Sequence, residues 1–356
     1  MKLLHVVDAR PNFMKVAPVW KSIAEETSFQ QKLVHTVQHY DVNMSDIFFT
    51  ELGLHEPDHY LGVGSSSHAR QTAATMVAFE EVINEFRSDI VLVYGDVNAT
   101  VANALVCAKL MIPVGHVEAG LRSFDRSMPE EINRLLTDQI SGLLFTTSKD
   151  ADENLVREGI SDSIIHFVGN VMIDTLVRLL PKAKKHNLEG LSDKYALVTL
   201  HRPSNVDDPV VLNNILKMLS KISDSIQVLF PIHPRTRQRI TDFRLGLSAS
   251  NKLKLMETIC YPDIFALQRE ASVVITDSGG IQVETTYLGV PCLTIRENTE
   301  RPITITMGTN TLVGNDMELL KKEVGRIIIG NGKQGQIPPL WDGQASLRIV
   351  NILQKL

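Results

Sequence analysis

Short apolar segments with β-strand character alternate with longer segments of helical periodicity, and this alternation limits the fold of the chain more than any other feature. In the first half, strands are expected at residues 3–7, 32–36, 90–94, 114–116, 143–146 and 164–168. Helices are expected between them, at residues 14–25, 69–86, 99–110, 130–139 and 151–158. This alternation predicts a parallel sheet with helices on both faces.

The same alternation restarts in the second half and predicts a second doubly wound α/β domain. Its strands are expected at residues 196–200, 227–230, 253–256, 273–276 and 291–295. A chain of 356 residues is also longer than one hydrophobic core usually serves. We expect domains at residues 1–169 and 170–340, followed by a helix in residues 341–356, for which a return to the first domain is one option.

The composition is that of an ordinary globular protein and favours a small-molecule partner. Hydrophobic residues make up 44% and charged residues 22% of the chain, and the net charge of −5 argues against nonspecific binding of nucleic acid. Cys107, Cys260 and Cys292 are widely spaced in apolar surroundings, which favours reduced thiols over a disulfide framework or a metal site. Because the N-terminal apolar run of five residues is too short for a signal-peptide core and no apolar run approaches the length of a membrane span, we expect a cytoplasmic protein without membrane association.

Residues 273–302, VVITDSGGIQVETTYLGVPCLTIRENTERP, combine a strand, an abrupt turn, a helix and a second strand. Ser278, Gly279 and Gly280 stand where the strand passes into the helix, so backbone N–H groups and the helix N-terminus can bind an oxyanion. Glu284 follows about one turn later, where its carboxylate can accept hydrogen bonds from a ribose. The stretch is a candidate nucleotide site, and a tight turn without ligand is the alternative that this spacing leaves open.

Polar residues follow several of the expected strands, where ligands of open α/β sheets bind. They lie in segments 8–15, 38–40, 95–100, 116–134, 201–205 and 233–235. Each has a plain structural explanation: Asp96 can cap a helix, and the pair Glu130 and Glu131 suits a helix start after Pro129. Their common position at strand ends favours a binding or catalytic site.

These motifs resemble those of the non-hydrolysing UDP-N-acetylglucosamine 2-epimerases. The similar segments are ARPNFMKVAPV (9–19), QHYDVNMSDIFF (38–49), VYGDVNAT (93–100), HVEAGLRSFDRSMPEEINR (116–134), TLHRPSNVDD (199–208), PIHPR (231–235) and TDSGGIQVETTYLGVPCLTIRENTERP (276–302). They follow the family's order over nearly the whole chain. The resemblance implies two Rossmann-like doubly wound domains that face each other across a cleft, as in GT-B glycosyltransferases.

The resemblance also implies a reaction, the inversion of C2 of UDP-N-acetylglucosamine to give UDP-N-acetylmannosamine. In the family, the bond to UDP breaks as the C2 proton leaves, and UDP adds back to the 2-acetamidoglucal while a proton reaches the opposite face. Such chemistry needs carboxylates beside C2 and cations beside the diphosphate. The sequence contains neither the G-x-G-x-x-G fingerprint nor metal-ligand spacing, so we expect no cofactor and no metal.

The matching positions supply candidate residues for each role. The catalytic candidates are Asp96, Glu118, Glu130 and His201, with Glu131 an alternative to Glu130 because two adjacent glutamates leave the register open, and the acid and base roles stay unassigned. The UDP-binding candidates are Arg10, Lys15, Ser278, Gly279, Gly280, Glu284 and Arg301. Gln38, His39, Arg70, Gln71 and His233 match a second, activating substrate site of some relatives, although His39 and His233 equally suit structural roles. Relatives are commonly dimers, so a homodimer is expected.

Three positions depart from the family's pattern and keep alternatives open. Asp8 and Val37 stand where glycine is expected, and Ser204 replaces a glutamate. A carboxylate at position 8 would repel a nearby diphosphate unless it pairs with a cation or turns away. The alternatives are the same reaction on another UDP-sugar, such as a UDP-diacetamido-glucuronate, a hydrolysing epimerase, a glycosyltransferase on the same scaffold, or a nucleotide-sugar-binding protein with weakened catalysis.

Overall fold

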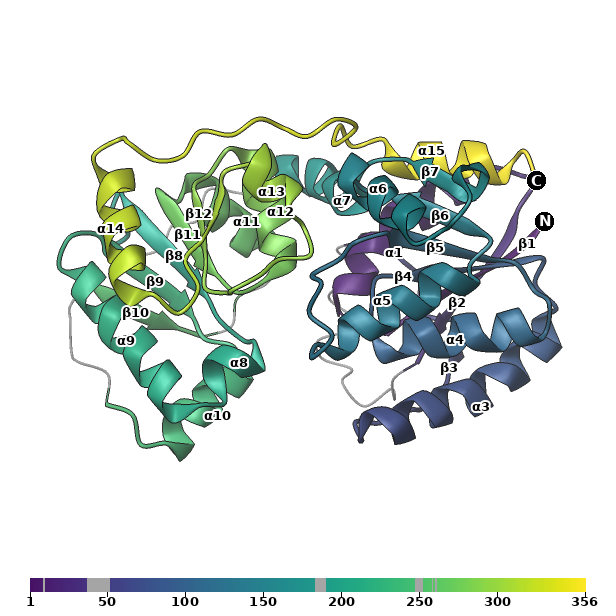
Figure 1. The fold of residues 1–356 in the computed structure, drawn as a ribbon, viewed down its shortest axis with the longest axis horizontal. Helices are drawn as coiled ribbons and strands as arrows, with labels where there is room; N and C mark the ends of the chain where they lie inside the picture. Colours follow the sequence, from purple (N-terminus) through teal and green to yellow (C-terminus); the bar gives the residue numbers. More distant parts are fainter. Residues whose placement is uncertain (9, 37–51, 183–189, 247–251, 258, 260) are drawn as a thin grey trace. The chain divides into compact units, whose positions relative to one another are not determined.

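The computed structural model describes residues 1–8, 10–36, 52–182, 190–246, 252–257, 259 and 261–356 (Figure 1). It divides into two compact units, which we call the first domain (Met1–Thr175 with Pro339–Leu356) and the second domain (Leu176–Pro338). Each contains a parallel sheet with helices on both faces, so the predicted doubly wound α/β class is confirmed. Within the described ranges, no helix is long and apolar enough to cross a membrane.

The described part of the first domain contains a seven-stranded sheet in the order β3-β2-β1-β4-β5-β6-β7. Its strands are β1 (Lys2–Val7), β2 (Gln30–His35), β3 (His59–Tyr60), β4 (Ile90–Tyr94), β5 (Val114–Ala119), β6 (Leu143–Thr146) and β7 (Ile165–Phe167). Its helices are α1 (Arg10–Ala24), α3 (His68–Phe86), α4 (Asn98–Lys109), α5 (Pro129–Ile140), α6 (Lys149–Arg157) and α15 (Ala345–Leu353), with a 3-10 turn at Asp162–Ile164. Helix α7 (Val171–Leu179) spans the first domain boundary.

The second domain contains a six-stranded sheet, counted over its described residues, in the order β10-β9-β8-β11-β12-β13. Its strands are β8 (Tyr195–Thr199), β9 (Gln227–Pro231), β10 (Leu253–Met256), β11 (Val273–Thr276), β12 (Cys292–Thr294) and β13 (Asn310–Leu312). Its helices are α8 (Pro203–Val206), α9 (Pro209–Ser223), α10 (Pro234–Asp242), α11 (Tyr261–Glu270), α12 (Gly279–Leu288), α13 (Ile303–Thr306) and α14 (Met317–Ile328), with a 3-10 turn at Leu180–Lys182.

The central strands, such as β4 and β11, are apolar without alternation because both faces of each sheet are covered. In β4 all five residues are buried, and Val91 and Val93 pack with Phe79 and Ile83 of α3 in the core of the first domain. In the second domain, the central strands pack against the apolar face of α9, including Leu212. Burial of apolar surface from both sides is the main stabilising contribution in each sheet.

Strand order brings the carboxyl ends of particular strands together. In the first domain β1 pairs with β2 on one side and with β4 on the other, and β4 pairs with β5. In the second domain β8 lies between β9 and β11 in the same way. The chain therefore reverses its winding direction at β1 and at β8, and ligands of open α/β sheets bind beside such reversals.

The C-terminal helix α15 packs against α1 of the first domain (Figure 1). The Asp174 carboxylate accepts hydrogen bonds from the amides of Ala345 (3.1 Å) and Ser346 (2.7 Å) at the start of α15. The buried Trp341 indole donates to the Thr147 carbonyl at 2.9 Å. These contacts hold the C-terminal segment on the first domain.

Candidate active-site residues in the two domains

Glu118 lies at the end of β5 in an unusual backbone conformation. Its φ of 78° is left-handed, and the pairing of β5 with β6 shifts register between Val117 and Ala119, as at a β-bulge. Such a conformation costs a non-glycine residue about 1–3 kcal/mol and is common at functional sites. The strand continues to Ala119, beyond the predicted end at residue 116, and the bulge lets a charged residue lie at its buried end.

The Glu118 carboxylate forms an ion pair with the ammonium group of Lys15 from α1. Both residues are nearly inaccessible, Glu118 at 3% and Lys15 at 5% exposure. Gly95, which follows β4, makes room for this pair, because a Cβ atom there would lie 2.6 Å from Lys15 Nζ. Gly95 also has a left-handed φ of 67°, so both the close contact with Lys15 and the backbone conformation favour glycine at this position.

Asp96 follows Gly95 and forms an ion pair with Arg134 from α5. Arg134 is buried, whereas the Asp96 side chain is 28% exposed. The guanidinium also contacts Glu131, with 3.0 Å between Arg134 Nε and Glu131 Oε2. Arg134 therefore links a candidate catalytic acid to a buried carboxylate of its own helix.

The structure distinguishes the two adjacent glutamates at the start of α5. Besides Arg134, buried Glu131 accepts hydrogen bonds from the amides of Ser123 (3.0 Å) and Phe124 (2.9 Å). Burial acts to raise the pKa of Glu131, but the Ser123 amide and Arg134 outweigh it and lower the pKa. Glu130 is half-buried, and its side chain has no hydrogen bond or ion pair with the described residues. Glu131 thus holds the 123–124 loop, which leaves Glu130 as the candidate for chemistry.

Asp8 directly follows β1, the strand beside β4, and hydrogen bonds hold it in place. Its carboxylate accepts a hydrogen bond from the Thr36 hydroxyl after β2, and its carbonyl oxygen lies 2.9 Å from His35 Nε2. Its amide donates to Asn12 Oδ1 at 3.2 Å. Arg10 begins α1. Val37, the second departure from the family's pattern, lies outside the described residues.

In the second domain, Asp277 fixes the segment that carries His201. The fully buried Asp277 carboxylate accepts hydrogen bonds from the amide of Arg202 (2.9 Å) and from Asn205 Nδ2 (3.1 Å), and lies 3.0 Å from His201 Nδ1. Burial acts to raise the pKa of Asp277, but the hydrogen bond and charge of His201 outweigh it and lower the pKa. The His201 ring stays 43% exposed, so it can reach a ligand. Ser204 lies exposed in α8.

Ser278, Gly279 and Gly280 lie at the start of α12, where the chain passes from β11 into the helix. Ser278 is the N-cap, and its side chain makes no capping hydrogen bond. A Cβ atom on Gly279 would collide with Arg301 and with Glu300, so the glycine admits the guanidinium to the helix end. The free N–H groups of a helix N-terminus carry partial positive charge, which Arg301 reinforces.

Glu300 holds Arg301 in place. This buried carboxylate forms ion pairs with Arg301 and with Arg296, the latter at 2.8 Å. Burial acts to raise the pKa of Glu300, but Arg301 and Arg296 outweigh it and hold the pKa well below its usual range. Glu284 is buried on the same helix as the glycines.

Comparison with known proteins decides the family. A sequence profile described as UDP-N-acetylglucosamine 2-epimerase matches residues 21–354. This chain belongs to the UDP-N-acetylglucosamine 2-epimerase family. The epimerase is 42% identical to the UDP-N-acetylglucosamine 2-epimerase of Methanocaldococcus jannaschii over 99% of both chains. It is 40% identical to the UDP-2,3-diacetamido-2,3-dideoxy-D-glucuronate 2-epimerase of Pseudomonas aeruginosa over 100% of both chains.

Solved structures agree with this assignment. The crystal structure of the M. jannaschii UDP-GlcNAc 2-epimerase in complex with UDP-GlcNAc and UDP aligns with a TM-score of 0.92 at 42% identity, covering 100% of both chains. The UDP-GlcNAc 2-epimerase of Neisseria meningitidis bound to UDP-GlcNAc aligns with a TM-score of 0.91 at 29% identity, also covering 100% of both chains. The epimerase therefore has the two-domain fold that the sequence resemblance implied.

Residues that match an activating site in some relatives are partly described. Gln38 and His39 lie outside the described residues, and Arg70 is exposed in the first turn of α3. The Gln71 side chain accepts a hydrogen bond from Asn98 Nδ2 at 2.8 Å.

Asn133 and His233 make further contacts near the candidate residues. Asn133 Nδ2 lies 3.3 Å from Asn98 Oδ1 and 2.9 Å from the Asp96 carbonyl oxygen, so polar contacts connect α3 to the Asp96 turn. In the second domain, His233 Nδ1 accepts a hydrogen bond from the Arg235 amide at 3.2 Å, and the His233 ring centroid lies 5.8 Å from that of His201.

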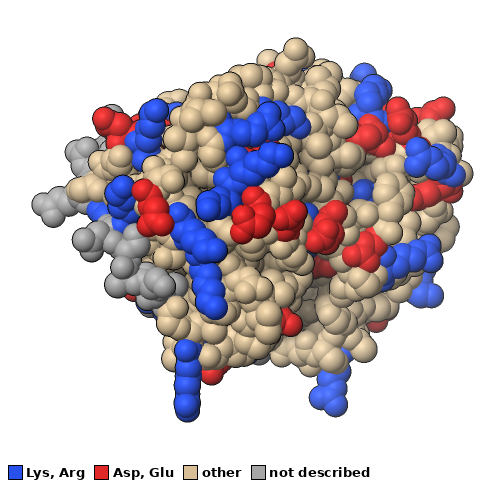
Figure 2. Space-filling view, turned by 60° about the vertical axis from the view of Figure 1, so that its left-hand side comes forward, with Lys and Arg blue, Asp and Glu red and all other residues tan. Residues whose placement is uncertain are grey.

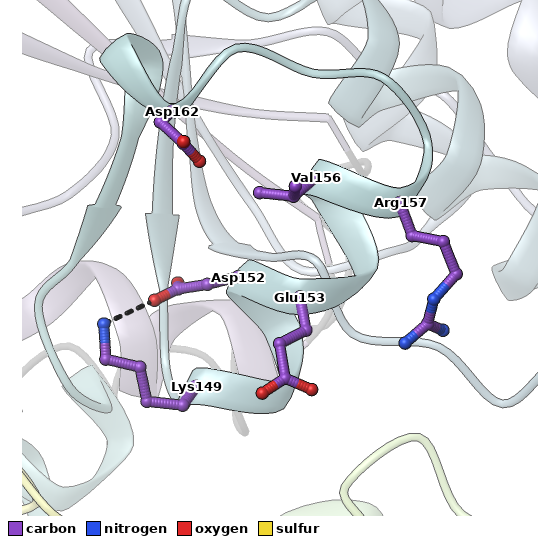
Figure 3. Close-up of a pocket in the computed structure, with 6 residues that line it drawn as sticks. All are labelled: Lys149, Asp152, Glu153, Val156, Arg157 and Asp162. Atoms are coloured by element: carbon purple, nitrogen blue, oxygen red, sulfur yellow. Dashed lines mark hydrogen bonds and ion pairs between the residues drawn. The ribbon is translucent and has the colours of Figure 1, made fainter.

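A surface pocket on the first domain is separate from these residues (Figure 3). It is lined by Lys149, Asp152, Glu153, Val156, Arg157 and Asp162, none of which is a candidate site residue. Acidic and basic side chains are also interspersed over the face shown in Figure 2. Among the described residues, no group of three His, Cys, Asp or Glu side chains is arranged to hold a metal ion.

Proposed function

We propose that this enzyme inverts C2 of UDP-N-acetylglucosamine, giving UDP-N-acetylmannosamine. UDP leaves as the C2 proton is removed, and it adds back to a bound 2-acetamidoglucal. The observation that carries the proposal is the near-complete alignment with the M. jannaschii epimerase. Further support comes from Asp96 and Glu118, which follow or end the adjacent strands β4 and β5.

The first domain is proposed to supply the proton transfers. No carbonyl acidifies the C2 proton, so its removal must accompany departure of UDP. Inversion also requires that a proton leave one face and arrive at the other, which two carboxylates on opposite sides of the sugar would achieve. Asp96, Glu118 and Glu130 are the candidates for these roles, and Asp96 and Glu118 each contact a buried cation.

The α12 N-terminus is proposed to bind the diphosphate. Ser278, Gly279 and Gly280 would offer N–H groups, and Arg301 would neutralise charge that develops on the leaving UDP. Glu284 would bind the ribose, and His201 would act beside the phosphates. Arg10 and Lys15 are the proposed phosphate ligands of the first domain.

Exchange in D2O tests this proposal. The protein is incubated with UDP-N-acetylglucosamine, and C2 deuteration, UDP release and sugar identity are followed by NMR. Reversible deuteration with intact UDP-sugar is expected, whereas free N-acetylmannosamine would indicate hydrolysis, and binding without exchange would contradict enzymatic turnover.

Substitutions of the candidate acids test their roles in the same exchange experiment. Asp96→Asn and Glu118→Gln should slow exchange by about 10²- to 10⁴-fold, the usual contribution of general acid–base catalysis. The affinity of Asp96→Asn for UDP should stay near the wild-type value, because its partner, Arg134, is not a proposed phosphate ligand. Glu153→Gln, an exposed carboxylate of α6, is the control and should leave exchange unchanged.

A second candidate substrate is a UDP-2,3-diacetamido-glucuronate, because the P. aeruginosa relative named for it is nearly as similar to this chain. Measuring kcat/KM for both UDP-sugars with the same enzyme decides between them. A higher kcat/KM for the glucuronate would replace the proposed substrate and keep the reaction. The product in either case is proposed to be a precursor of envelope or capsule polysaccharide.

We also propose a homodimer in the cytoplasm. Exposed apolar residues on α3 and α5, including Val77 (66% exposed) and Leu136 (51% exposed), support a dimer, because both helices border α4 and can form one face. Light scattering at micromolar concentration tests the dimer. The free, buried Cys107 and Cys292 suit a reducing compartment, and fluorescence imaging of a tagged chain tests the location.

A further inference from the structure

Four ionisable side chains, three buried and one 24% exposed, form a cluster near the ends of β4 and β5 in the first domain. His116 of β5 and Asp138 of α5 are essentially inaccessible, with 2.6 Å between His116 Nδ1 and Asp138 Oδ1. Arg122 lies 2.7 Å from the other Asp138 oxygen and forms a bidentate pair with Glu158 at 2.8 and 2.6 Å. None of these side chains was assigned a role by the sequence or is used in the proposed reaction.

One end of the cluster holds the turn that carries Asp96. His116 Nε2 lies 2.8 Å from the carbonyl oxygen of Gly95, the residue that precedes Asp96. Gly95 has a left-handed φ of 67° and lies against the Lys15 ammonium group, so the direction of its peptide sets where the chain goes next. This hydrogen bond therefore fixes the start of the Asp96 turn.

The other end of the cluster holds the bulge that carries Glu118. Asp138 Oδ2 accepts a hydrogen bond from the amide of Gly120 at 3.2 Å. Gly120 has a left-handed φ of 79°, and a Cβ atom there would lie 2.5 Å from the Ala151 carbonyl oxygen. The Asp138 carboxylate thus holds the left-handed Gly120, two residues after the left-handed Glu118.

Both ring nitrogens of His116 face acceptor oxygens. Nε2 faces the Gly95 carbonyl oxygen, which can only accept, and Nδ1 faces the Asp138 carboxylate. Burial acts to raise the pKa of Asp138, but the charges of His116 and Arg122 outweigh it and lower the pKa. The buried Asp138 carboxylate therefore has a partner at each of its two oxygens.

We propose that His116 is a positioning residue for the reaction, because its hydrogen bond to the Gly95 carbonyl oxygen holds the Gly95–Asp96 turn against β5, the strand that carries Glu118, so that both acids keep a fixed separation. This inference rests on the proposed function, in which Asp96 and Glu118 serve one sugar ring. Proton transfer is sensitive to such geometry, and a displacement of about 1 Å can reduce the rate about a hundredfold.

Two substitutions of His116 separate positioning from stability. The amide nitrogen of Asn overlies Nδ1, so H116N keeps a donor to Asp138 and loses the donor to Gly95. The amide nitrogen of Gln overlies Nε2, so H116Q keeps the donor to Gly95 and loses the one to Asp138. Each variant leaves one buried acceptor without its donor, so comparable falls in melting temperature are expected.

The rate of C2 deuteration should distinguish them. H116N is expected to lose about a hundredfold in kcat with an unchanged Kd for UDP, while H116Q keeps most of the wild-type kcat. Glu158→Gln weakens the far end of the cluster and is the control, with a lower melting temperature and an unchanged kcat.

Equal losses of kcat in the two His116 variants, or losses that follow melting temperature in all three, would overturn the inference. If H116N does not fold, H116Q alone tests the inference. This variant keeps the donor to the Gly95 carbonyl oxygen, so a large loss of its kcat would contradict positioning through the His116–Gly95 hydrogen bond. A wild-type protein without any exchange would instead refute the proposed function.

Discussion

The clearest test of the candidate site compares Glu130→Gln with Glu131→Gln, two isosteric changes at adjacent positions. Glu131 is 1% exposed and accepts hydrogen bonds from two backbone amides, the Ser123 hydroxyl and Arg134. Removing one partner of a buried ion pair costs about 3–5 kcal/mol, and because Gln keeps one acceptor oxygen we expect about 3 kcal/mol. For a domain of this size, that corresponds to a fall of about 6–12 °C in melting temperature.

Glu130→Gln should behave in the opposite way. Its half-buried side chain makes no hydrogen bond or ion pair with described residues, so the free energy of unfolding should change by less than about 0.5 kcal/mol. If Glu130 transfers a proton, exchange at C2 should fall by about 10²- to 10⁴-fold. Differential scanning fluorimetry and the NMR exchange assay measure the two effects. An unchanged melting temperature for Glu131→Gln, or full turnover by Glu130→Gln, would refute the assignment of these two residues.

Three further outcomes are expected. Arg134→Lys keeps the positive charge but cannot contact both Asp96 and Glu131, so the rate of C2 exchange should fall about a hundredfold. Calorimetry should give an unchanged Kd for UDP, and an equal loss of UDP affinity would argue against a role confined to these carboxylates. Gly279→Ala displaces the Arg301 guanidinium and should weaken UDP binding by about 1.5–3 kcal/mol, roughly 10- to 150-fold in Kd. In the control Gly325→Ala the added methyl group meets open space, so the Kd for UDP should not change. The folded-state pKa of Glu300 is lowered, so the stabilisation that its carboxylate provides is present above the unfolded pKa of about 4.3 and is lost as pH falls through the folded pKa. The difference in melting temperature between wild type and Glu300→Gln should therefore narrow below about pH 4. A difference that stays constant with pH would contradict this linkage.

Much of the fold could be predicted because both sheets are buried on two faces, which leaves long apolar runs in the sequence. The strands at Ile90–Tyr94 and Val273–Thr276 were predicted at the observed bounds for this reason. The short edge strands β3 (His59–Tyr60) and β13 (Asn310–Leu312) were not predicted, since two or three residues carry no measurable periodicity. The end of β5 was placed too early, because the buried charge of Glu118 looks like the start of a loop.

The site residues could be proposed from motif and position, but their partners could not. Glu130 and Glu131 are equivalent in the sequence, and the hydrogen bonds of the Ser123 loop separate them. Asp138 lies in the middle of a helix pattern, where nothing indicates that its carboxylate reaches His116. Similarly, the pairing of Asp8 with Thr36 depends on the alignment of β1 with β2, which local sequence does not reveal.

The way α15 joins the first domain affects the order in which the protein can mature during synthesis. The second domain is one uninterrupted stretch of chain, whereas the first needs residues 339–356 to seat Trp341 and to meet the Asp174 carboxylate. Translation proceeds from the N-terminus, and domains generally fold as units. Synthesis of the second domain is therefore finished before α15, which completes the first domain, has been made.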